Sequence, residues 1–163
     1  MFDFLQHYSD NTRLWIYQSP RAFSAEELIW IDREGGLFAE SWKTHGTSMK
    51  ALVKVLYDRF LIIAADEDVT GSSGCSVDSS VRFIKGIEQQ TGVNLMDRML
   101  VYYMDHQGNP VSFHFHDLGK LIEQGVLTPV TNVFNPLVTT KPALLNQWLM
   151  PLERSWLANF VTG

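Results

Sequence analysis

The stretch FLIIAA, residues 60–65, constrains the fold more than any other part of the chain. A strand with no polar residue at either phase of a two-residue alternation must be covered on both faces. The preceding run ALVKVLY, residues 51–57, also has the pattern of a strand, and Asp58-Arg59 can form a turn between two strands. We therefore expect a hairpin whose second strand lies inside a sheet.

Other segments also have strand patterns. RLWIYQS (13–19) indicates a first strand, and RMLVYYM (98–104), PVSFHF (110–115) and TNVFNPLVT (131–139) indicate later ones. Gly108, between the second and third of these segments, suits a hairpin turn. Because hairpins need no crossover connection, the pairing should be largely antiparallel.

A capping box at Ser24–Glu27 begins the first helix, in which the Ser24 hydroxyl and the Glu27 carboxylate each satisfy an orphan amide. The apolar face of this helix contains Leu28, Ile31, Phe38 and Trp42. Gly35 and Gly36 interrupt it, and each costs about 1 kcal/mol relative to alanine. They predict either a bend or the close approach of another backbone.

Three more helices are expected. One begins near Val77 and ends near Gly92, and a short one, Leu118–Gln124, can be capped by Asp117 and closed by Gly125. Thr140 can cap a C-terminal helix that Pro151 should kink or split. The apolar stripe of this last helix contains Leu145, Trp148, Leu149, Leu152 and Trp156. We expect the stripe to pack on the protein's own core, with homo-oligomerisation through it as the alternative.

Together these patterns predict an α+β fold. Residues 1–163 should form a single domain, in which about four helices cover a mixed, largely antiparallel sheet.

Composition excludes several classes of function. The net charge of −5 and the absence of a basic run argue against nonspecific nucleic-acid binding. The longest apolar run is far shorter than the ~20 residues that span a bilayer, and MFDFLQHYSD is not a secretory signal, so no membrane insertion is expected. One cysteine cannot form an internal disulfide, which fits a reducing compartment. We expect a soluble, cytoplasmic protein.

The segment DEDVTGSSGCSVDSSVRFIK, residues 66–85, is the strongest candidate for a site. A Gly/Ser loop that enters a helix N-terminus can hold an anion, because the first helical amides point outward without partners. The predicted binding residues for a small anionic ligand are Ser72, Ser73, Gly74, Ser76 and Asp78. The structural alternative is a tight connection in which Asp78 and the serines cap the helix.

Cys75 gives a second hypothesis, a cysteine-dependent hydrolase or transferase. A thiol at a helix N-terminus has a lowered pKa. His45 would be the base, and Asp66 or Glu67 would orient its ring. Nearby carboxylates disfavour the thiolate form of Cys75. The preferred hypothesis is therefore a non-catalytic binding or interaction protein, and the cysteine-dependent enzyme is the alternative.

Nothing in the sequence requires a cofactor. No G-x-x-x-x-G-K-[ST] loop is present, which argues against a P-loop ATPase. His114 and His116, two apart on a predicted strand, can hold zinc with His106 as a third ligand, and the carboxylates at 66–68 can hold magnesium. An exposed strand face and a solvated acidic turn explain both groups without a metal.

Several motifs carry a family resemblance over most of the chain: WIYQSPR, WKTHG, DE followed by SGCSVDSSVRFIK, DRMLVYY, FNPLVTT and WLMPLERSW. The chain resembles a small family of bacterial proteins of similar length that often carry the label "ABC transporter ATPase". The resemblance implies a shared fold and no particular reaction. Its motif residues here are Trp42, His45, Gly46, Glu67, Ser73, Gly74, Cys75, Ser76, Asp78, Asn135, Thr140 and Trp156.

Overall fold

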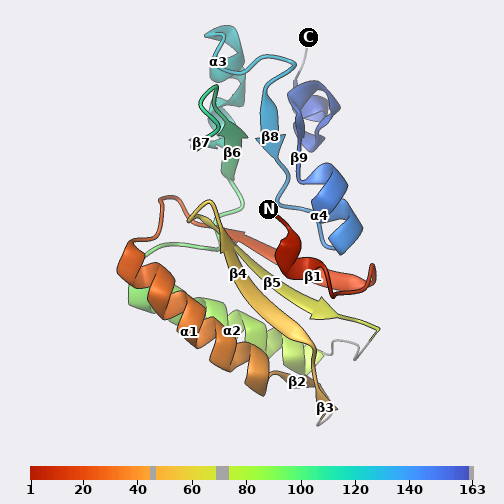
Figure 1. Cartoon of the computed structure of the whole chain (residues 1–163). Coiled ribbons are helices and arrows are strands. Elements are labelled where there is room, and N and C mark those ends of the chain that lie inside the picture. Colours follow the sequence, from red (N-terminus) through yellow and green to blue (C-terminus); the bar gives the residue numbers. More distant parts are fainter. Residues whose placement is uncertain (45–46, 69–73, 162–163) are drawn as a thin grey trace.

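The computed structural model describes residues 1–44, 47–68 and 74–161, with the backbone alone for residues 43–44, 47–48 and 74–76. It has the α+β fold that the sequence predicts (Figure 1). The α-helices are α1 (Ala25–Ser41), α2 (Gly74–Thr91), α3 (Leu118–Glu123) and α4 (Lys141–Gln147). The strands are β1 (Thr12–Gln18), β2 (Lys43–Thr44), β3 (Thr47–Ser48), β4 (Ala51–Leu56), β5 (Phe60–Asp66), β6 (Leu100–Met104), β7 (Pro110–His114), β8 (Asn132–Phe134) and β9 (Leu149–Pro151). Short 3-10 helices are η1 (Asp3–Leu5), η2 (Phe115–Asp117), η3 (Leu152–Arg154) and η4 (Trp156–Phe160).

The first sheet has the strand order β1-β5-β4, with both pairs antiparallel. All seven residues of β5 are buried, which confirms the expected central strand. The turn before it is centred on Tyr57 and Asp58, one residue earlier than predicted. Both residues have positive φ, 52° and 58°, and the Arg59 amide donates to the Leu56 carbonyl at 3.1 Å. This is the geometry of a type I′ turn, whose twist matches that of paired strands.

The expectation of one sheet is wrong, because the later strands form a second antiparallel sheet of order β7-β6-β8-β9. The β6–β7 hairpin is confirmed, and Gly108 adopts the expected positive φ of 81° in its turn. In Figure 1, α1 and α2 lie below the first sheet and the second sheet lies above it.

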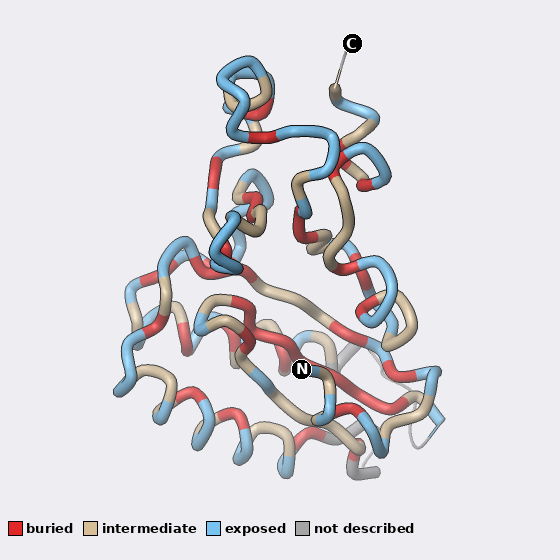
Figure 2. The backbone as a smooth tube through the Cα atoms, turned by 45° about the horizontal axis from the view of Figure 1, so that its top comes forward, coloured by how far each residue is buried: buried red, intermediate tan, exposed pale blue. Residues whose placement is uncertain are grey.

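An aromatic cluster joins the two sheets. The Phe60 ring, on β5, lies 5.0 Å from Tyr102, 4.7 Å from Phe134 and 5.2 Å from Trp148, measured between ring centroids. All four side chains are almost fully buried. Figure 2 shows the buried residues concentrated in the middle of the molecule, with exposed residues along the outer sides of the helices. Burial of such large rings stabilises the fold by about 1.5–3 kcal/mol each.

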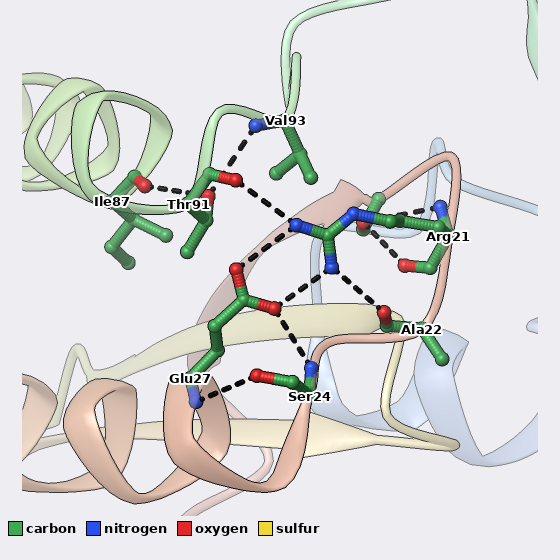
Figure 3. A network of polar contacts seen from close by, with 8 residues as sticks. Arg21, Ala22, Ser24, Glu27, Ile87, Thr91 and Val93 are labelled. Atoms are coloured by element: carbon green, nitrogen blue, oxygen red, sulfur yellow. Dashed lines mark hydrogen bonds and ion pairs between the residues drawn. The ribbon is translucent and has the colours of Figure 1, made fainter.

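The capping box at the start of α1 is confirmed and is part of a larger network (Figure 3). The Arg21 guanidinium donates to both carboxylate oxygens of Glu27, at 2.8 and 3.0 Å, and to the Thr91 carbonyl at 3.0 Å. Glu27 also accepts from the Ser24 amide at 2.8 Å. Arg21 therefore ties the beginning of α1 to the end of α2.

Two predictions for the later helices are wrong. The apolar stripe does not continue one C-terminal helix, because α4 ends at Gln147 and the chain then forms β9, η3 and η4. Pro151 cannot donate the hydrogen bond that a helix would require, and here it ends an extended strand. Asp117 occupies the N-cap position of α3 but makes no side-chain capping hydrogen bond, because η2 already leads into this helix.

The stripe itself is mostly used in the protein's own core, as expected. Trp148 and Leu152 are buried, whereas Leu145 is exposed. Oligomerisation through this segment stays a prediction. Within the described residues, every helix is too short or too polar to cross a bilayer.

Candidate functional site

The Gly/Ser loop lies mainly outside the described residues. This applies to Ser72 and Ser73 and also to His45 and Gly46. The backbone of α2 begins at Gly74, three residues before the predicted start, so Gly74, Cys75 and Ser76 belong to its first turn. Asp78 is exposed on the same helix. The proposed Cys75–His45 pair and the loop anion site therefore stay predictions.

Asp66, considered above as an orienting group for His45, has a structural role at the end of β5. Its carboxylate accepts from the Ser9 amide at 2.9 Å, from the Ser9 hydroxyl at 2.6 Å and from the Asp68 amide at 3.1 Å. Burial raises the pKa of this carboxyl, but these hydrogen bonds and the nearby Lys50 ammonium outweigh burial and lower the pKa overall. Asp66 thus holds the N-terminal segment against the first sheet.

The other two acidic residues, Glu67 and Asp68, line an open hollow of about 610 Å³ that they share with Asp10 and Arg13. Asp68 accepts from the Asn11 side-chain amide at 2.7 Å. Within the part of the chain that the structure describes, no three His, Cys, Asp or Glu side chains are grouped to hold a metal ion.

The predicted shared face of His114 and His116 is not a strand face, because β7 ends at His114 and His116 lies in η2. The two rings are stacked, with centroids 4.9 Å apart. The His116 amide donates to His114 Nδ1 at 3.3 Å, so this nitrogen serves the local turn.

A groove that the sequence did not suggest lies beside β1. We call it the β1 groove. It has a volume of about 510 Å³, within the range of small-molecule sites. Its walls come from β1, α2, the segment before β6 and the segment after β8. The lining residues are Ile16, Tyr17, Gln18, Val81, Leu95, Met96, Asp97, Arg98, Pro136 and Leu137.

The walls of the β1 groove are mainly apolar. Leu137 is 67% exposed and Met96 is 40% exposed, so both side chains present apolar surface at the groove. Met96 lies before β6 and Leu137 lies after β8, so only the folded chain brings these two residues together. The groove therefore offers apolar surface that an amphiphilic ligand can cover.

Backbone groups of β1 also point into this space. In the first sheet, the Asp66 amide donates to the Lys50 carbonyl, on the β4 side. Because hydrogen-bonding directions alternate along an antiparallel strand, the even-numbered residues of β5 bond to β4 and the odd-numbered residues bond to β1. Odd-numbered residues of β5 pair with odd-numbered residues of β1, so the even-numbered residues of β1 turn their amides and carbonyls away from β5. The Leu14 amide confirms this by donating to the Thr139 carbonyl at 2.8 Å. The Ile16 amide points the same way but donates no hydrogen bond to any other described residue.

Three polar side chains complete the β1 groove. Gln18 is 6% exposed; its Nε2 donates to the Leu100 carbonyl at 2.8 Å, and its buried Oε1 has no partner in the described structure. Asp97 accepts from the Met99 amide at 2.8 Å. The exposed Arg98 guanidinium has neither a hydrogen-bond nor an ion-pair partner within residues 1–44, 47–68 and 74–161.

An adjoining hollow lies along α2 and carries two further basic side chains. It has a volume of about 380 Å³ and is lined by Asp78, Val81, Arg82 and Lys85. Val81 belongs to both hollows. Asp78, a predicted ligand residue, thus lines this adjoining hollow and not the β1 groove itself.

In comparisons with protein-family models, with curated proteins and with solved structures, no match to this chain was found. The family resemblance stays an expectation from sequence motifs. The geometry of the chain itself has to carry any assignment of function.

Proposed function

We propose that this protein is a non-catalytic binding protein that holds a small organic anion with an apolar body in the β1 groove. The observation that carries the proposal is the unpaired Arg98 guanidinium at the rim of a mainly apolar groove. A guanidinium binds carboxylate or phosphate through two parallel hydrogen bonds. The Ile16 amide supplies a further donor, and the apolar walls cover the ligand body.

This proposal keeps the expected class of protein and ligand but uses a different site. The Gly/Ser loop enters α2 at its N-terminus, whereas the β1 groove contacts the same helix at Val81. Both sites would bind an anion. The site at Arg98 is favoured because it combines an unpaired guanidinium with a mainly apolar groove.

Calorimetric titration with octanoate tests the proposal, with 1-octanol as the uncharged probe of the same chain length. We expect saturable binding of octanoate and at least tenfold weaker binding of octanol. Arg98→Gln should weaken octanoate binding about tenfold, since a hydrogen bond to a charged group contributes about 1.5–3 kcal/mol. Arg154→Gln, which changes an exposed arginine outside the groove, is the matched control.

Two results would contradict the proposal. One is equal affinity for octanoate and octanol, which would leave no role for a cation. The other is unchanged octanoate binding by Arg98→Gln. The absence of saturable binding of octanoate and of 3-phenylpropionate at millimolar concentration would also exclude this ligand class.

A further inference from the structure

The free edge of β4 is a second unoccupied hydrogen-bonding surface, independent of the β1 groove. The Asp66–Lys50 backbone hydrogen bond fixes which residues of β4 pair with β5. By alternation, Leu52, Lys54 and Leu56 bond to β5, and Ala51, Val53 and Val55 direct their amides and carbonyls outward. These outward groups have no partner among the described residues. β4 therefore presents a six-residue edge ready for another strand.

A groove of about 410 Å³ runs between this edge and α1; we call it the β4 groove. On the helix side it is lined by Asp32, Gly36, Ala39 and Glu40. A Cβ atom at Gly36 would meet nothing within 4 Å, so the small residues leave a recess beside the strand. In Figure 1, α1 runs along β4 and no strand lies beyond it. An added strand would thus have one face against α1.

The β4 groove is acidic. Asp32 and Glu40 are exposed and have no ion-pair partner within the described chain. The lining also contains the cation Lys50, which is already engaged: its ammonium donates to the His7 carbonyl and lies 3.7 Å from the Asp66 carboxylate and 4.6 Å from the centre of the Tyr8 ring. The two carboxylates of α1 are therefore available to a basic partner.

Charge also argues against a second copy of this chain as the occupant. Val53 packs in the core cluster between the first sheet and the helices α1 and α2. Neighbouring residues of a strand point to opposite faces, so the Lys54 side chain projects from the face of the sheet away from α1. In an antiparallel β4–β4 pair it could not reach the partner's carboxylates on α1. Such a pair would instead bring the acidic sides of two α1 helices together.

The spacing of the carboxylates matches an extended chain. Asp32 and Glu40 are eight residues apart on α1, which is about 12 Å along a helix axis. Residues i and i+4 of a strand point to the same face and are about 13 Å apart. Two basic residues at this spacing can each face one carboxylate, with residue i+2 beside Gly36.

We propose that β4 accepts an extended basic segment of another protein as a fourth strand of the first sheet. Lys or Arg at positions i and i+4 face Asp32 and Glu40, and a small residue at i+2 occupies the recess at Gly36. Main-chain hydrogen bonds to Ala51, Val53 and Val55 hold the segment, and the carboxylates select its charge.

Fluorescence anisotropy with a labelled TKVAVKT peptide tests this, with TEVAVET as the charge-reversed probe. We expect TKVAVKT to bind at least tenfold more tightly. The double variant Asp32→Lys/Glu40→Lys should weaken its binding about tenfold, since each exposed ion pair contributes about 0.2–1 kcal/mol and reversal adds repulsion. Gly36→Leu should weaken it by filling the recess. Gly86→Leu, at an exposed and equally open position on α2, should leave binding unchanged.

Amide hydrogen exchange supplies the readout for strand addition. The Val53 and Val55 amides should exchange rapidly in the free protein and become protected with TKVAVKT in proportion to the bound fraction. Equal binding of both peptides, or binding without protection of these amides, would overturn the proposal. Protection of the same amides without peptide, together with a dimeric mass in solution, would assign the edge to a second copy and would also overturn it.

Discussion

Gly35 lies so close to Val53 that a Cβ atom at position 35 would stand 2.9 Å from the Val53 Cβ. This close contact lets α1 pack directly on β4 beside the β4 groove. It also separates the roles of two adjacent glycines, because Gly36 faces open space. The sequence predicted either a bend or the close approach of another backbone at this pair; the structure shows close approach at Gly35 alone, and the approaching group is the Val53 side chain rather than a backbone.

Gly35→Ala should destabilise the protein by about 1–3 kcal/mol, the usual cost of forcing an extra methyl group into a packed core. The Val53 Cβ cannot move away by changing rotamer, so α1 or β4 must shift. Gly36→Ala is the control and should stabilise the fold by about 0.5–1 kcal/mol, because alanine is the better helix former and meets no atom. Urea unfolding of both variants measures the difference. A Gly35→Ala protein at least as stable as the wild type would contradict the close contact.

The Arg21–Glu27 pair predicts a change of stability in acid. Hydrogen bonds from Arg21 and from the Ser24 amide lower the pKa of Glu27 to about 2. The folded-state pKa lies below that of the unfolded chain, about 4.3, so this contribution is complete above pH 4.3 and is lost as the pH falls towards 2. Glu27→Gln should cost about 1–2 kcal/mol at pH 7 and flatten the fall in stability between pH 5 and 2.

The control for this experiment is Glu34→Gln. Glu34 Oε1 lies 3.5 Å from Arg33 Nε, and both side chains are substantially exposed. Removing the Glu34 charge should therefore change the free energy of unfolding by less than about 0.5 kcal/mol. Urea unfolding at pH 7, 4 and 2.5 compares the two variants. An unchanged acid slope in Glu27→Gln would show that the network of Figure 3 does not contribute through its charge.

Asp66→Asn should release the N-terminal segment from the first sheet. Both carboxylate oxygens accept hydrogen bonds here, whereas the side-chain amide of asparagine has one accepting oxygen and one donating nitrogen. A charge-assisted hydrogen bond contributes about 1.5–3 kcal/mol. We expect a loss of about 2–3 kcal/mol and faster proteolysis near Ser9. Asp68→Asn, which retains an oxygen for the Asn11 side chain, should have little effect. Equal proteolysis of the two variants would contradict the anchoring role of Asp66.

Local signals in the sequence were sufficient for most elements. The apolar run at 60–65 identified the central strand because only a strand covered on both faces tolerates such a pattern. The capping box at Ser24–Glu27 was found because it satisfies backbone amides within three residues, and the glycine turns were found because glycine readily adopts a positive φ. The extended helix at the C-terminus was predicted wrongly because Leu149 and Leu152 also fit a strand and a turn that pack on the second sheet.

The candidate site was harder to predict for a physical reason. The β1 groove combines residues 16–18, 81, 95–98 and 136–137, which no local pattern relates. Its signal in the sequence is limited to exposed apolar residues such as Leu137 beside Arg98, and these acquire meaning only when the fold brings them together. The Gly/Ser loop, by contrast, was conspicuous in the sequence because its motif is continuous.

Two-dimensional ¹H–¹⁵N NMR of the labelled protein, titrated with octanoate, tests the central claim most directly. We predict saturable shift changes at the amides of Ile16, Gln18, Met96, Arg98 and Leu137, and about tenfold weaker saturation in Arg98→Gln. Changes centred instead on residues 74–78, or an Arg98→Gln protein that saturates like the wild type, would contradict binding in the β1 groove.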